Sequence, residues 1–212
     1  MKSTARLVAC AVVTLVLTGV GTSAQAFVSH GHRHTLHLGH VTSGHHMRLE
    51  QDGSSRVLRA LGRLDRRLVH ATSAYRLAPL TDADRDALLK NAEADEAAVE
   101  AVATSYSATP SDTHLAEAKD VLRGYHPIRY VRATNIVRHS ERTSARILAL
   151  QPLVVAGSAD ETALANAAEL LAGVSASGFS ATTTVDAMHA ARAAVAQARA
   201  LVGQVQDDLA SV

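Results

Sequence analysis

A cluster of histidines near the N-terminus holds the residues best suited to chemistry. Seven of the chain's 12 histidines lie between positions 30 and 46: His30, His32, His34, His37, His40, His45 and His46. Neutral imidazole is a common ligand of Zn²⁺, Cu²⁺ and Ni²⁺. In an extended chain the first three point to the same side, about 6–7 Å apart. We predict that this segment binds such ions weakly and with loose selectivity, because it must order itself around the metal.

Two alternatives for the histidine cluster stay open. The segment could be a passive polar linker, or a tether that becomes cationic in acid and adheres to anionic components of the cell envelope. The cluster contains no carboxylate, and the chain has no His-Glu-x-x-His motif. The pattern therefore does not predict a metalloenzyme, and we expect no required cofactor.

The remaining sequence lacks the motifs of common enzyme classes. It has no Gly-x-Ser-x-Gly elbow, no phosphate-binding glycine loop and no dinucleotide fingerprint. The other five histidines are scattered, at His70, His114, His126, His139 and His189. We interpret His126, beside Pro127, as part of a helix junction. Asp95 interrupts an apolar helix face, and we expect it to be partly exposed and paired with an arginine rather than a perturbed carboxylate. We predict that the protein is not an enzyme.

The first 26 residues have the organisation of a cleavable signal peptide. Lys2 and Arg6 precede an apolar stretch over 7–20, and Ala-Gln-Ala ends at Ala26. A stretch of that length is short of the roughly 20 residues that span a bilayer. We predict cleavage before Phe27, an extracytoplasmic location and no membrane span in the mature chain. The residues that end in Cys10 resemble a lipoprotein box, in which the cysteine is lipidated. In a lipoprotein the apolar region precedes that cysteine, whereas here it follows, so we do not expect Cys10 to be lipidated.

The mature composition limits the stabilising chemistry and the partners. Cys10 is the only cysteine, so the mature chain contains no disulfide or thiolate metal site. Removal of Lys2 and Arg6 leaves 19 of the 21 basic residues against 20 acidic ones. This near-neutral balance argues against nucleic-acid binding. We expect the partner to be either an unknown protein or an anionic envelope component.

The apolar pattern predicts an all-α fold after a disordered His-rich tether over 27–49. Apolar residues recur at helical spacing over about 53–78, up to Pro79. Thr81, Ser111 and Ser158 are candidate caps for the following helices. Pro127 either begins a new helix or kinks a long one that ends near Pro152. We expect further helices over about 158–173 and 185–209, with a loop over 174–184.

These elements predict an antiparallel bundle of five or six helices over 50–212, with coiled-coil-like seams. A weak echo at an offset of 76 residues matches Asp84 with Asp160 and Leu88 with Leu164. It raises the hypothesis of an internal duplication, with halves near 50–126 and 127–212.

Two basic stripes run along the expected helices. One comprises Arg56, Arg59, Arg63, Arg67 and His70, and the other comprises Arg132, Asn135, His139, Arg142 and Arg146. They could form a ridge for an anionic envelope polymer or for phospholipid headgroups. We favour the interpretation that they pair with acids of the helix that follows Thr81, because the total charge is close to zero.

The leading hypothesis from sequence is a secreted or envelope-associated, non-enzymatic helical binding protein with a metal-responsive N-terminal tether. The alternative is a structural or protein-partner bundle whose histidines are passive or pH-responsive.

Overall fold

The computed structural model describes residues 48–211, with side chains from residue 53 onward. The helices are α1 (Arg48–Ala71), α2 (Ala74–Leu77), α3 (Asp82–Ala108), α4 (Asp112–Gly124), α5 (Ile128–Leu150), α6 (Ala159–Ala172) and α7 (Val185–Ala210), with 3-10 turns η1 (Gln151–Leu153) and η2 (Ala176–Gly178). No strand occurs in this range, which confirms the all-α prediction. The predicted signal peptide and nearly all of the predicted tether lie outside the described residues.

Side-chain caps begin the helices where the sequence placed them. The hydroxyl oxygens of Thr81, Ser111 and Ser158 accept the backbone N–H three residues on. These bonds satisfy donors that have no partner within the helix. At the start of α6, the Glu161 carboxylate also accepts the N–H of Gly157, at 2.6 Å.

The Pro127 junction separates two helices. α4 ends at Gly124, and Tyr125 is extended with φ −90° and ψ 120°. Pro127 then immediately precedes α5 with a helical φ of −54°. Of the two sequence alternatives, the new helix is correct.

The first predicted helix lies earlier in the chain than expected, because it begins at Arg48, inside the predicted tether, and ends before position 78. α1 ends at Ala71, and Ser73, with ψ 146°, breaks the helix before the single turn of α2. The Thr72 hydroxyl donates to the Leu68 carbonyl at 3.0 Å, a local bond that occupies a carbonyl at the end of α1. The break rotates the following residues, so Tyr75, which continues the helical spacing of the apolar residues in α1, is 90% exposed while Leu77 is fully buried.

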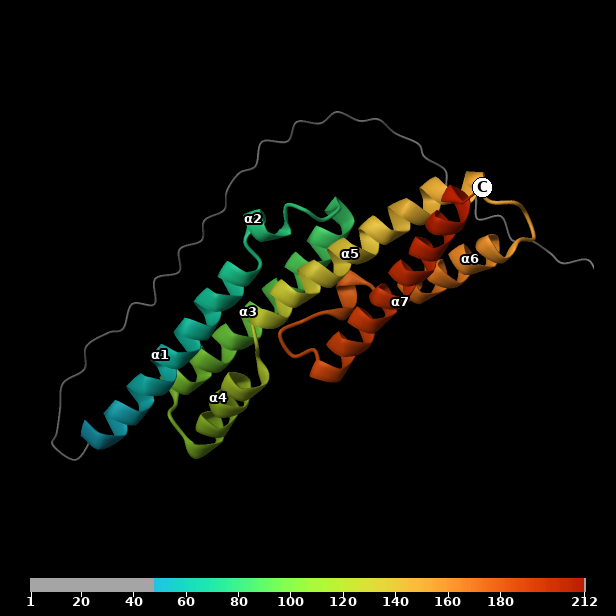
Figure 1. The fold of residues 1–212 in the computed structure, drawn as a ribbon. Coiled ribbons are helices and arrows are strands. Elements are labelled where there is room, and N and C mark those ends of the chain that lie inside the picture. Colours follow the sequence, from blue (N-terminus) through green and yellow to red (C-terminus); the bar gives the residue numbers. More distant parts are fainter. Residues whose placement is uncertain (1–47, 212) are drawn as a thin grey trace, which may run out of the picture. The chain divides into compact units, whose positions relative to one another are not determined.

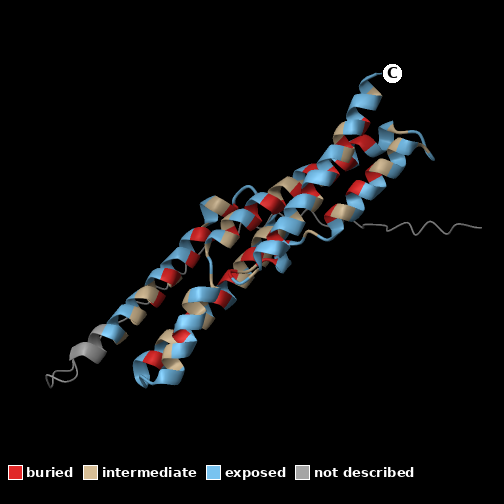
Figure 2. Cartoon of the chain, turned by 60° about the horizontal axis from the view of Figure 1, so that its bottom comes forward, coloured by how far each residue is buried: buried red, intermediate tan, exposed pale blue. Residues whose placement is uncertain are grey.

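Apart from the single turn of α2, the described α-helices pack in two sets of three (Figure 1). α3 runs back along α1 and contacts α4, whereas α6 runs back along α5 and packs on α7. Figure 2 shows buried residues along the sides of the helices that face one another. Both sets contribute buried apolar side chains to the hydrophobic core, such as Leu61, Leu68 and Leu88 from the first and Leu164 and Val202 from the second. The shared order of helices fits the hypothesis of a duplication, which stays a prediction.

The segment between α6 and α7 is part of the core. Ala176, Phe179 and Ala181 are buried, although they lie in the predicted loop and serines and threonines surround them in the sequence. Asn91 of α3 donates to the carbonyls of Ser177 and Phe179, at 3.0 and 2.8 Å. These bonds hold the segment against α3 and fix the point from which α7 begins.

Candidate functional site

The structure describes the five scattered histidines but not the predicted metal ligands. All seven histidines of the cluster, from His30 to His46, lie outside the described residues. Within the described part, no three or more His, Cys, Asp or Glu side chains are placed to hold a metal ion. His139 of α5 and His189 of α7 line the same groove, whereas His126 lies at the α4–α5 junction, as predicted.

A buried carboxylate ties three distant parts of the chain together. Asp95 of α3 is 8% exposed, and its Oδ2 accepts hydrogen bonds from the Tyr130 hydroxyl and the Ala181 N–H, both at 2.7 Å. The Ala181 carbonyl accepts in turn from the His126 N–H at 2.8 Å and from the Arg129 guanidinium at 2.7 Å. This network joins α3, the start of α5 and the segment that leads into α7.

The expectation for Asp95 was wrong. It is buried rather than partly exposed, and its hydrogen-bond partners are a phenol and a backbone amide instead of an arginine. Burial, followed by the hydrogen bond to the Asp95 carboxylate, raises the pKa of Tyr130 far above its ordinary value. Tyr130 therefore stays a neutral donor, and the network is a structural anchor that sets the positions of α5 and α7.

A basic groove of about 620 Å³ lies between α5 and α7. Its charged and polar rim comes from Arg132, Asn135 and His139 of α5 and from His189, Arg192 and Arg199 of α7. Ile136, Met188 and Val195, all buried, form its floor. Among the described residues, no acidic side chain lines it, so the rim that they form presents only positive charge and neutral polar groups.

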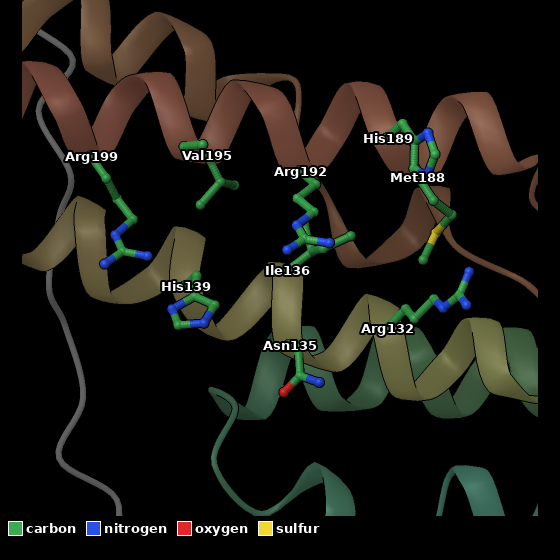
Figure 3. Close-up of a pocket in the computed structure, with 10 residues that line it drawn as sticks. Arg132, Asn135, Ile136, His139, Met188, His189, Arg192, Val195 and Arg199 are labelled. Atoms are coloured by element: carbon green, nitrogen blue, oxygen red, sulfur yellow. The ribbon is translucent and has the colours of Figure 1, made fainter.

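Figure 3 shows how these side chains are directed. Arg199 and Arg192 extend from α7 toward α5, and Arg132 reaches from α5 toward Met188, while Asn135 points away from α7. His139 lies below Arg199 in this view. Burial, followed by the charges of Arg199, Arg138 and Arg142, lowers the pKa of His139. At neutral pH His139 is therefore a neutral polar group between cations.

The groove arginines have no acidic partner within the chain as described. Among side chains of residues 53–211, ion pairs form only between Arg85 and Asp82 and between Arg123 and Asp120, each within one helix. The interpretation that the two basic stripes pair with acids of α3 is therefore wrong. In the second basic stripe, the side chains of Arg132 and His139 instead face the groove beside α7.

Glu96 and Glu100 of α3 lie near Asp65 of α1. Burial, followed by the charges of Asp65, Glu93 and Asp95, raises the pKa of Glu96 to about 7. Burial and the charge of Glu100 likewise raise the pKa of Asp65. These carboxylates between α1 and α3 thus lie close to one another, and none of them forms an ion pair among the described side chains.

Sequence reasoning missed the contribution of α7 to this groove. His189, Arg192 and Arg199 are the only basic residues of that helix, and no acid occurs between Asp186 and Asp207. Their spacing of three and seven places them near one helical face. A cationic face on an alanine-rich helix was therefore the sequence pattern that could have predicted the contribution of α7 to the groove.

Comparisons with known protein families, with curated proteins and with solved structures found no match to this chain. Among the described helices, none is both long and apolar enough to cross a membrane.

Proposed function

We propose that the chain is an exported, non-enzymatic helical binding protein that holds a linear polyanion in the groove between α5 and α7. The observation that carries this proposal is the groove rim, where Arg132, Arg192 and Arg199 gather with no acid in the lining. Arginine guanidinium groups suit phosphate and carboxylate oxygens because their donors form a planar fork. Export rests on the signal-peptide pattern of residues 1–26.

The length of the basic groove favours a linear ligand over a compact one. Arg192 and Arg199 are seven residues apart, which is about 10.5 Å along a helix. His189 extends the same row to about 15 Å. A single phosphate contacts only part of such a row, whereas a chain of phosphates places an anionic group near each cation.

Titration calorimetry with linear polyphosphate tests this proposal in the chain that begins at Phe27. The Arg192→Ala/Arg199→Ala variant should bind about tenfold or more weakly, because each lost arginine removes charge-assisted hydrogen bonds. The control is Arg59→Ala/Arg146→Ala, which removes the same charge from exposed positions outside the groove. We expect the control to bind like the parent, and orthophosphate to bind the parent more weakly than the polymer. Equal losses in both double variants would reduce the effect to net charge and refute the groove.

The histidine cluster carries a second candidate function, weak binding of Zn²⁺, Cu²⁺ or Ni²⁺. Seven imidazoles between positions 30 and 46 supply more than the three or four ligands that such an ion takes. Each metal should be titrated into the chain that begins at Phe27 and into a version that lacks 27–49. We expect binding only with the segment present. Equal binding by both versions, or by neither, would contradict this function and leave the segment a passive linker.

A further inference from the structure

A second basic groove lies where the first set of helices meets the start of α5, apart from the groove between α5 and α7. It has a volume of about 550 Å³ and lies between α1, α4 and the start of α5. Arg63 and Arg67 of α1 and Arg76 of α2 supply its positive groups, and His126 also lines it. Among the described residues, no acidic side chain lines this groove either.

Most of this second lining is apolar, unlike that of the first groove. Leu64 and Ala71 of α1 are buried beneath it, and Leu122 of α4 and Val131 of α5 are half-buried along it. Ile128, also in the lining, is 54% exposed. An exposed branched side chain beside a concave apolar floor offers surface that an apolar ligand would remove from water.

The positive groups are arranged at the rim of this floor. The Arg76 guanidinium lies 3.2 Å from His70 Nε2 and donates a hydrogen bond to it, which orients the arginine. Pro127, which gives α5 no side-chain cap, also lines the groove, and the first turn of α5 contains no acid. The positive end of the α5 dipole therefore adds to the field of Arg63 and Arg67.

We propose that this second groove binds an amphipathic anion, a phosphate or carboxylate head group joined to one apolar chain. The head group contacts Arg63, Arg67 and Arg76, and the chain covers Leu64, Ile128 and Val131. The same chemistry occurs in a free acid and in an anionic membrane lipid. The proposal does not depend on the polyanion site, because the two grooves share no residue.

Calorimetry with octyl phosphate, inorganic phosphate and octanol separates the contribution of the anionic head group to binding from that of the apolar chain of the ligand. We expect the chain that begins at Phe27 to bind octyl phosphate about tenfold or more tightly than inorganic phosphate or octanol, because only octyl phosphate satisfies both the rim and the floor. Arg63→Ala/Arg67→Ala should lose about tenfold or more in octyl phosphate affinity. Ile128→Ser should weaken octyl phosphate binding and leave inorganic phosphate unchanged.

The matched control is Arg59→Ala/Arg66→Ala, which removes two exposed arginines of α1 that lie outside the lining. This control should bind octyl phosphate like the parent, as should the Arg192→Ala/Arg199→Ala variant of the first groove. Circular dichroism confirms that each variant is folded. Equal affinity for octyl phosphate and inorganic phosphate, or equal losses in both α1 double variants, would overturn the proposal.

Sedimentation with phosphatidylglycerol vesicles distinguishes the two sources of this ligand. Binding of octyl phosphate without recruitment to vesicles identifies a free amphiphile. Recruitment that Arg63→Ala/Arg67→Ala abolishes and Arg59→Ala/Arg66→Ala preserves identifies a membrane lipid. Absence of both octyl phosphate binding and recruitment would refute the second site while leaving the polyphosphate result unaffected.

Discussion

The hydrogen bond between Tyr130 and Asp95 should make Tyr130→Phe unusually costly for so small a change. The substitution keeps the fully buried ring and removes only the hydroxyl that donates to the carboxylate at 2.7 Å. A hydrogen bond to a charged group contributes about 1.5–3 kcal/mol. For a domain of this size, that loss corresponds to a fall in melting temperature of roughly 3–12 °C.

Tyr106 of α3 provides an internal control for this measurement. It is also buried, but its hydroxyl donates to the neutral Ser54 Oγ at the longer distance of 3.2 Å. Tyr106→Phe should therefore cost only about 0.5–1.5 kcal/mol. Urea unfolding followed by circular dichroism compares the two variants. A double-mutant cycle with Asp95→Asn should give a coupling free energy above about 1 kcal/mol for Tyr130. A loss for Tyr130→Phe no larger than that for Tyr106→Phe would refute the anchor.

Three further predictions concern pH, the helix break and export. Because the pKa of Glu96 is about 7 in the folded protein against an ordinary 4.5, the folded state binds more protons between these values, so stability falls as pH rises through this window. After allowance for solvent screening, Glu96→Gln should raise the free energy of unfolding, measured in urea, by about 0.5–1 kcal/mol near pH 8 and by less near pH 5. An equal gain for the exposed control Glu169→Gln would show that the raised pKa of Glu96 is not the cause. Tyr75→Ala should change the free energy of unfolding by less than about 0.5 kcal/mol, whereas Leu77→Ala should lower it by about 2–5 kcal/mol. Losses of similar size in the two variants would contradict the helix break after α1. N-terminal sequencing of the protein exported by its host should begin at Phe27, and a chain that retains residues 1–26 would disprove cleavage.

Local signals in the sequence predicted most of the helices. Threonine or serine at 81, 111 and 158 and proline at 127 act within a few residues, so their effects are visible without the fold. The break at Ser73 was missed because Tyr75 and Ala78 continue the helical spacing of α1. An apolar residue that keeps the period need not be buried once the backbone turns.

The candidate sites depended on contacts that no local pattern contains. Asp95 meets Tyr130 and Ala181, which are 35 and 86 residues away in sequence. The basic stripe of α5 was visible, but its partner could be identified only from the packing of α7 beside it. Near-neutral total charge suggested mutual pairing, whereas the acids that surround Glu96 instead cluster with one another.

Backbone NMR of the chain that begins at Phe27, titrated with linear polyphosphate, locates the bound polyanion on the fold. The amide shifts should change most over 132–139 and 188–199, on the two helices that line the basic groove. Changes confined to other helices, or spread evenly over every exposed arginine, would contradict binding in this groove.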